Sequence, residues 1–293
     1  MRPIAYSVPF GRSTFVPAGC LHWPIGEKDL LREWVRQVAE AENGFTILMG
    51  DSLDCARTHY RDHVRGYRQD ENSQQALDEW MKRDVEALAK ELQPIKKKII
   101  GIILGNHFWE FSDGTNSEQY LSRLLDVPYL GPMGVVRLEF RTPSNNNCVR
   151  HQMTLFAHHS GGGNGGRTTG ADVGALERQE ASFDADIYCL SHTHRRHGFK
   201  VPQLALNRKG QPRLTERTRV FMRTGAFLKG FAEDYPSKDR PHVPTYAEKK
   251  ALRPTDLGWV SLHIKLSHVH VKGLSKRRGQ PGGEVRSEFT IAY

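Results

Sequence analysis

The stretch FTILMGDSLD, residues 45–54, joins a short apolar run to two carboxylates, and the same arrangement recurs later in the chain. Three further apolar runs end in polar clusters, at Gly105-Asn106-His107, Ala157-His158-His159 and Ser191-His192-Thr193-His194. Short apolar runs of this kind are typical of strands buried on both faces. Because the carboxyl ends of parallel strands meet at one edge of a sheet, we expect the four clusters to converge. Their carboxylate, amide and imidazole groups predict a metal site.

Helical patterns alternate with these runs. Apolar residues at helical spacing predict amphipathic helices over 28–42 and 75–92, with Trp34 and Trp80 in the core, and Ser117 is suited to cap a third helix. Strands are expected at residues 45–49, 99–104, 153–157, 187–190, 220–224 and 259–266. This alternation predicts an α/β fold with a mostly parallel sheet that is covered on both faces.

The composition fits one soluble domain that binds an anion. We expect a single domain over residues 1–293, with a basic insertion at 55–72 and long surface loops at 207–257. The four cysteines form no Cys-x-x-Cys pair, which argues against zinc-ribbon and thioredoxin-like proteins. The net charge of +9 favours a phosphorylated anionic substrate, with nucleic acid as one candidate, although a merely basic protein has the same charge.

No segment of the sequence predicts a membrane contact. The first residues lack the apolar core of a signal peptide, and no stretch approaches the roughly 18 apolar residues that cross a bilayer. We therefore expect a cytoplasmic protein; the sequence does not specify its oligomeric state.

The ordered set of clusters resembles the calcineurin-like metallophosphoesterase superfamily. That pattern is Asp-x-His, Gly-Asp-x-x-Asp, Gly-Asn-His-Asp/Glu, a lone strand-end His and Gly-His-x-His, and its elements occur in this order over residues 19–227. The chain departs from it at Cys20 in place of the first Asp, at Phe108 in place of Asp/Glu and at Ser191 in place of the last Gly. The resemblance implies a four-layer α/β/β/α sandwich of two mixed sheets flanked by helices. It also implies a metal-dependent phosphoesterase, in which a metal-bound hydroxide attacks a phosphomonoester or phosphodiester at a dinuclear centre.

The resemblance implies a role for each cluster. Two divalent ions, expected to be manganese, iron or zinc, would be held by Asp51 as the bridge, by His22 and His194 on one ion, and by Asn106, His158 and His192 on the other. His107 would face the substrate as the catalytic residue, protonating the leaving oxygen or stabilising the phosphoryl charge. Asp54 would orient a ligand or the loop.

The sequence leaves two metal-ligand assignments open. Cys20 stands where the family has its first Asp; a thiolate there would favour zinc or iron over magnesium, whereas a packed thiol would leave that ion fewer protein ligands. Either His158 or His159 could be the strand-end ligand. We favour His158 because it directly follows the apolar run 155–157, which leaves His159 to line the entrance and contact substrate.

Candidate substrate contacts follow two of the clusters. Arg57 and Arg61 belong to a basic segment interleaved with aromatic residues, which could contact phosphates and stack bases, although a solvated surface segment has the same composition. Arg167 follows a glycine-rich run that could approach a phosphate. With the net charge, these residues slightly favour a phosphodiester in a nucleotide or nucleic acid. The alternative, prompted by Cys20, is a nucleic-acid-binding or interaction protein that has lost turnover.

Overall fold

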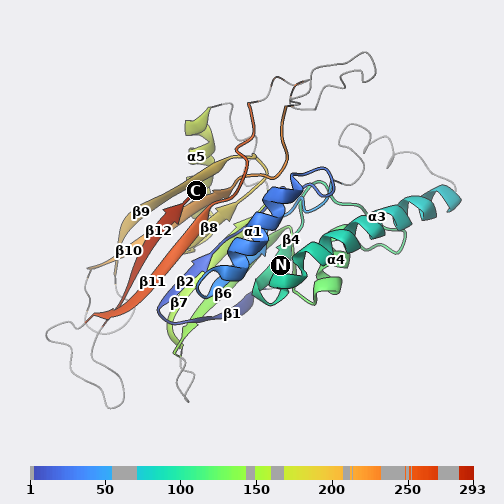
Figure 1. The fold of residues 1–293 in the computed structure, drawn as a ribbon. Helices are drawn as coiled ribbons and strands as arrows, with labels where there is room; N and C mark the ends of the chain where they lie inside the picture. Colours follow the sequence, from blue (N-terminus) through green and yellow to red (C-terminus); the bar gives the residue numbers. More distant parts are fainter. Residues whose placement is uncertain are drawn as a thin grey trace.

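The protein was analysed as a computed structural model (Figure 1). The structure describes residues 3–54, 71–142, 149–159, 168–206, 212, 214–231, 248, 251, 253–269 and 284–293. Arg57, Arg61 and Arg167 lie outside the described residues, as does most of the expected basic insertion.

In the described part of the chain, twelve strands form two six-stranded mixed sheets. Sheet I has the strand order β1 (Ile4–Pro9), β6 (Met133–Arg141), β7 (Val149–His158), β8 (Ile187–Leu190), β10 (Leu214–Thr224) and β9 (Arg196–Leu206). Sheet II has the order β12 (Glu284–Ala292), β11 (Ser261–Val269), β2 (Arg12–Phe15), β3 (Gly44–Leu48), β4 (Ile99–Ile103) and β5 (Tyr129–Gly131). The pairs β6–β7, β9–β10, β11–β12 and β2–β11 are antiparallel and the other pairs are parallel, so both sheets are mixed.

The main core lies between the two sheets. Leu155 and Ile187 of sheet I and Ile47 and Ile100 of sheet II belong to one cluster of buried apolar side chains. Alternation along a strand sends neighbouring side chains to opposite faces, so Leu48, next to Ile47, packs in a different cluster beneath the helices. The strands β3 and β4 of sheet II are therefore buried on both faces, as their continuous apolar runs predict.

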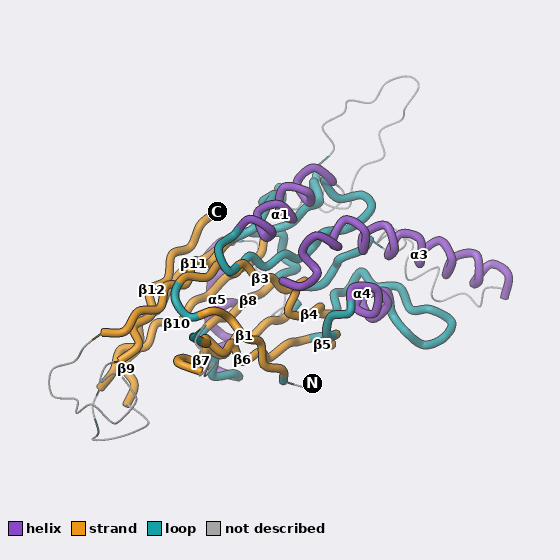
Figure 2. Tube along the Cα trace, turned by 60° about the horizontal axis from the view of Figure 1, so that its bottom comes forward, coloured by secondary structure: helices purple, strands orange, loops and turns teal. Residues whose placement is uncertain are grey.

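Helices cover the outer face of each sheet (Figure 2). Sheet II carries α1 (Lys28–Glu40), α3 (Glu71–Leu92), the 3₁₀ helix η1 (Gln93–Lys98) and α4 (Ser117–Leu125). Sheet I carries α5 (Thr169–Glu177) and the 3₁₀ helix η2 (Arg178–Ala181), with Leu176 of α5 packed on Phe156 and Tyr188. This arrangement confirms the expected four-layer sandwich of two mixed sheets flanked by helices. No helix among the described residues is long and apolar enough to span a membrane.

Two local predictions are wrong. The N-cap of α4 is Asn116 rather than Ser117: its side chain accepts a hydrogen bond from the Gln119 N–H at 2.8 Å, and the Gln119 side chain accepts one from the Asn116 N–H. Trp80 of α3 is 59% exposed, whereas its neighbour Met81 is buried. Successive helical residues lie about 100° apart, so only one of these two neighbours can face the sheet.

Candidate metal centre

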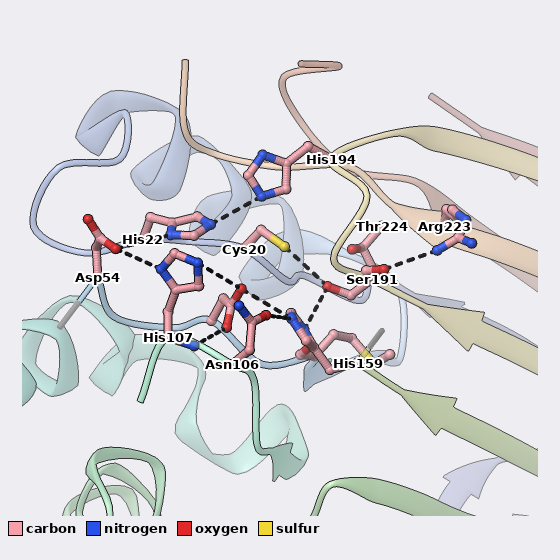
Figure 3. Close-up of polar contacts among 12 residues, drawn as sticks. Cys20, His22, Asp54, Asn106, His107, His159, Ser191, His194, Arg223 and Thr224 are labelled. Carbon is pink, nitrogen blue, oxygen red and sulfur yellow. Dashed lines mark hydrogen bonds and ion pairs between the residues drawn. The ribbon is translucent and has the colours of Figure 1, made fainter. Parts of the chain in front are cut away.

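The four polar clusters meet where the two sheets adjoin (Figure 3). The loops after β3 and β4 belong to sheet II and carry Asp51 and Asn106, whereas the loops after β7 and β8 belong to sheet I and carry His159 and His194. Each strand therefore delivers a polar side chain to the same edge of the sandwich, as the sequence predicts.

Backbone conformation sets this region apart. Cys20, His22, Asp51, His192 and His194 all have positive φ, between 50° and 80°. A non-glycine residue in such a conformation costs about 1–3 kcal/mol and persists only where the surrounding structure holds it in place. Five strained residues on three separate loops indicate a functional site.

Two glycines allow the loops after β3 and β4 to touch. A Cβ added to Gly105 would lie 2.1 Å from both the backbone N and Oδ1 of Asp51. A Cβ on Gly50, which has φ of +83°, would lie 2.7 Å from the Gly105 Cα. Because the backbones approach this closely, the Asp51 carboxylate also accepts a 2.8 Å hydrogen bond from the His107 N–H.

His159 lies with Asp51 and Asn106 in one half of the centre. Its Nε2 is 3.0 Å from the Asn106 Oδ1 and 3.1 Å from the Asp51 Oδ2, and its Nδ1 donates to the Met49 carbonyl at 2.7 Å. The carbonyl can only accept, so Nδ1 carries a proton and Nε2 is the atom that could bind a metal after losing its own proton. Burial lowers the pKa of His159, but the Asp51 carboxylate outweighs burial and raises that pKa, so a metal would have to displace the Nε2 proton. Adjacent ligands on an octahedral ion are about 3 Å apart for bonds of about 2.1 Å, so these three atoms fit one divalent ion.

His158 lies on the other face of sheet I. It is half-buried beside Phe156, with ring centroids 6.2 Å apart, under the layer that contains α5. Since β7 extends through His158, its pleat places Phe156 and His158 outward and the next residue, His159, toward the centre. The structure thus brings His159 rather than His158 to Asp51.

Cys20, His22 and His194 form the second half of the centre. The Nε2 atoms of His22 and His194 face each other at 3.2 Å, and the potential ligand atoms of all three residues lie within 4.8 Å of one another. Burial, and after it the neighbouring His22, lowers the pKa of His194 well below its ordinary value. His194 is therefore neutral near pH 7, the form that binds metals.

His107 is held by a carboxylate beside both halves. Its Nδ1 is 2.7 Å from the Asp54 Oδ1, and its Nε2 is 3.9 Å from the Asp51 Oδ2. Burial alone would raise the pKa of Asp54, but the hydrogen bond from His107 and the nearby His22, whose Nδ1 is 3.8 Å from the Asp54 Oδ1, outweigh it and hold that pKa well below its usual range. Asp54 is therefore a carboxylate that fixes the orientation of His107.

Asp51 and His192 complete the group of expected site residues. Burial raises the pKa of Asp51, but the adjacent His159, His22 and His107 together lower it well below its ordinary value, so this carboxyl group is ionised. His192 is exposed, with its ring centroid 5.1 Å from that of His159. Desolvation and the nearby His159 lower the pKa of His192 to about 4, so it too is neutral near pH 7.

A buried ion pair behind the centre was not predicted. Arg223 Nε of β10 lies 2.9 Å from the Asp172 Oδ1 of α5, and Arg223 Nη1 donates to the Ser191 carbonyl at 3.0 Å. The Ser191 hydroxyl lies 3.3 Å from both the Cys20 Sγ and the His159 Nδ1. Arg223 therefore anchors the start of the loop that carries His194. Its only signal in the sequence is a charged residue inside the apolar run 220–224.

The site is of the class that divalent ions occupy, with histidine, carboxylate and amide ligands at strand ends. No protein-family model and no curated protein matches the chain. Similar solved structures include Vps29 from Chaetomium thermophilum, at 12% identity over 97% of each chain with a TM-score of 0.34, and Vps29 from Cryptosporidium parvum, at 15% identity over 96% of this chain and 98% of that one with a TM-score of 0.38.

Two further solved structures are similar to the chain. One is a conserved uncharacterised protein and predicted phosphoesterase from Streptococcus pneumoniae, at 13% identity over 95% of this chain and 99% of that one, with a TM-score of 0.32. The other is Vps29 from Entamoeba histolytica in complex with Zn²⁺, at 10% identity over 95% of this chain and 98% of that one, with a TM-score of 0.36. What we propose for this chain rests on its own site.

Proposed function

We propose that this chain is a metal-dependent phosphoesterase of the calcineurin-like type, which hydrolyses a phosphomonoester or phosphodiester at a centre of two divalent ions. The main support is the placement of His159 Nε2 at 3.0 Å from the Asn106 Oδ1 and 3.1 Å from the Asp51 Oδ2, directly beside the facing His22 and His194. Manganese, iron and zinc are the candidate ions.

The geometry supports an assignment of the ligands that differs from the sequence-based one at a single position. One ion would be held by Asp51, Asn106 and His159, and the other by His22 and His194. The bridging role of Asp51 and the ligand role of His192, whose ring centroid lies 5.1 Å from that of His159, are carried over from the sequence-based assignment. His159 takes the place of His158 because only His159 lies beside Asp51. When bound, two such ions polarise the phosphoryl group and lower the pKa of a water molecule so that it can attack.

His107 is the proposed catalytic residue. Because the Asp54 carboxylate accepts from Nδ1, Nε2 is the ring atom that faces the metal side and can carry a second proton. The Asp54 carboxylate holds the imidazole ring in this orientation, as a carboxylate does for the histidine of a catalytic triad. His107 would give the Nε2 proton to the leaving oxygen and thereby prevent a full charge from developing there.

The proposed substrate class rests on charge. The chain carries a net charge of +9, which attracts polyanions, and this slightly favours a phosphodiester in a nucleotide or nucleic acid. Arg57, Arg61 and Arg167 are proposed to contact its phosphates. A monoester would be an equally good chemical substrate for the centre itself.

The test compares phosphoesterase activity in four proteins. Wild type, His107→Ala, His159→Ala and His158→Ala are assayed with manganese on a chromogenic monoester, a chromogenic diester and single-stranded and double-stranded DNA. We expect His107→Ala and His159→Ala to lose activity by about 100-fold or more, since general acid–base catalysis alone contributes about 10²–10⁴-fold. His158→Ala is the matched control and should stay near wild type.

The outcomes separate the two classes of function. If wild type shows no metal-dependent turnover above that of His107→Ala on any of these substrates, the proposed phosphoesterase function is refuted. If the same protein bound DNA with unchanged affinity in the absence of metal, the alternative of a nucleic-acid-binding protein without turnover would replace it.

A further inference from the structure

Cys20 has unusual surroundings for a buried cysteine. It is fully buried, as is Cys189 of β8. Cys189 belongs to the cluster of apolar side chains between the sheets, but Cys20 belongs to none of the three apolar clusters in the described part of the chain. Its neighbours are polar: the Ser191 hydroxyl at 3.3 Å, and the ligand atoms of His22, His194, Asp51 and His159. A role in apolar packing accounts for Cys189 and does not account for Cys20.

The backbone holds the Cys20 side chain toward the centre. Its N–H donates to the Gly50 carbonyl at 2.9 Å, and its own carbonyl accepts from the Phe227 N–H at 3.0 Å. Between these two hydrogen bonds, Cys20 adopts a left-handed conformation with φ of 55°. This conformation is costly for a residue with a Cβ, so the surrounding loops impose the direction of the thiol.

The distances match a sulfur and nitrogen site. The two Nε2 atoms of His22 and His194 are 3.2 Å apart, close to the spacing of about 3.3 Å for two nitrogens bound to tetrahedral zinc at about 2.0–2.1 Å. The Cys20 sulfur lies within 4.8 Å of one ring nitrogen of each histidine. In a formed zinc site that separation is about 3.6 Å, so side-chain movements of about 1 Å complete the site.

We propose that Cys20 is a thiolate ligand of the ion held by His22 and His194, which makes this half of the centre selective for zinc or ferrous iron. The inference rests on the proposed function, because it concerns one of that centre's two ions. Binding breaks the S–H bond: the sulfur gives its electron pair to the metal, and the proton leaves to solvent. The other half, with Asp51, Asn106 and His159, has more oxygen ligands and suits manganese or magnesium. The structure thus assigns two unlike ions to one centre.

Cobalt(II) reports on the ligand directly. Metal-free protein is titrated with Co²⁺, and its absorption is recorded in the visible region for metal binding and in the near-ultraviolet for sulfur-to-cobalt charge transfer. We expect wild type to show both signals. Cys20→Ala should keep visible bands from cobalt bound by the other ligands and should lose the charge-transfer band. Cys189→Ala is the matched control and should keep both, as should Cys55→Ala and Cys148→Ala.

The outcomes distinguish failure of this inference from failure of the proposed function. Visible bands without charge transfer in wild type, or a charge-transfer band that survives in Cys20→Ala, would overturn the thiolate ligand and leave the metal centre intact. A wild type that binds no cobalt would overturn both.

Metal preference gives a second measurement. Competition between zinc and manganese, followed by mass spectrometry of the bound ions, should show zinc affinity about 100-fold weaker in Cys20→Ala, since even loss of an outer partner of a ligand costs about 10–100-fold. Cys20→Asp should still bind two ions and should shift the first site toward manganese. Unchanged zinc preference in Cys20→Asp would contradict the proposal.

Discussion

Asp172→Asn should destabilise the metal-free protein by about 3 kcal/mol, because it leaves the Arg223 guanidinium buried without its counter-ion. Both side chains are only 1% exposed and lie 2.9 Å apart. Removal of one partner from a buried ion pair typically costs about 3–5 kcal/mol. The lower end applies here because Arg223 keeps its hydrogen bond to the Ser191 carbonyl. Replacement of both residues, by Asp172→Leu with Arg223→Met, should come much closer to wild type, since the guanidinium charge is removed as well and only His197, whose Nε2 lies 3.1 Å from the Asp172 Oδ2, loses a partner.

Urea unfolding is measured for wild type, Asp172→Asn, Asp172→Leu, Arg223→Met and the double variant; wild type and the last three form a double-mutant cycle. The same proteins are titrated with metal, because Arg223 anchors the start of the loop that carries His194. We expect Asp172→Asn to weaken metal binding as well as folding. A free energy of unfolding within about 1 kcal/mol of wild type for Asp172→Asn would refute the reasoning, since a buried unpaired guanidinium cannot cost so little.

Three further predictions concern the centre and its support. Gly105→Ala should abolish metal binding measured by mass spectrometry, because its Cβ would lie 2.1 Å from Asp51; retained stoichiometry would show that the loops can separate. Asp54→Asn should lower kcat more than it changes metal content, because it weakens the 2.7 Å contact that orients the His107 ring; equal loss of both would indicate a ligand role for Asp54. Glu118 is fully buried, and burial is the main cause that raises its pKa to about 7. The folded protein therefore binds the Glu118 proton more tightly than the unfolded chain does. As a result, the free energy of unfolding falls as the pH rises from about 4.5 to 7. Glu118→Gln should reduce this pH dependence of the free energy of unfolding, which is at most about 3 kcal/mol when measured by urea unfolding. A pH dependence equal to that of wild type would show that Glu118 is not its cause.

The strand ends were predictable because their signal is local. Each apolar run is read directly from consecutive residues, and in a sandwich buried on both faces such runs can only be interior strands. The polar residue that follows a run is then at the strand's carboxyl end, whatever the rest of the chain does. Asp51 and Asn106 could therefore be placed from the sequence, and the structure brings their side chains to the same edge.

The choice between His158 and His159 could not be made from the sequence, because it depends on where β7 ends. If the strand stopped at Ala157, the next residue could turn into the site. In the structure β7 continues through His158, and one further residue reverses which histidine faces inward. Arg223 and Asp172 were missed for a different reason: their pairing joins a strand to a helix about 50 residues earlier in the chain, and no local pattern records it.

The ligands come from both sheets, and this has a consequence for folding as well as for chemistry. Sheet II contributes the loops with Asp51 and Asn106, and sheet I contributes those with His159 and His194. A bound pair of ions would therefore cross-link sheet I to sheet II at the edge of the sandwich. The distance between the two ions would depend on how the sheets are aligned, so a substitution in the core between the sheets would alter metal affinity even though it lies far from the ligands.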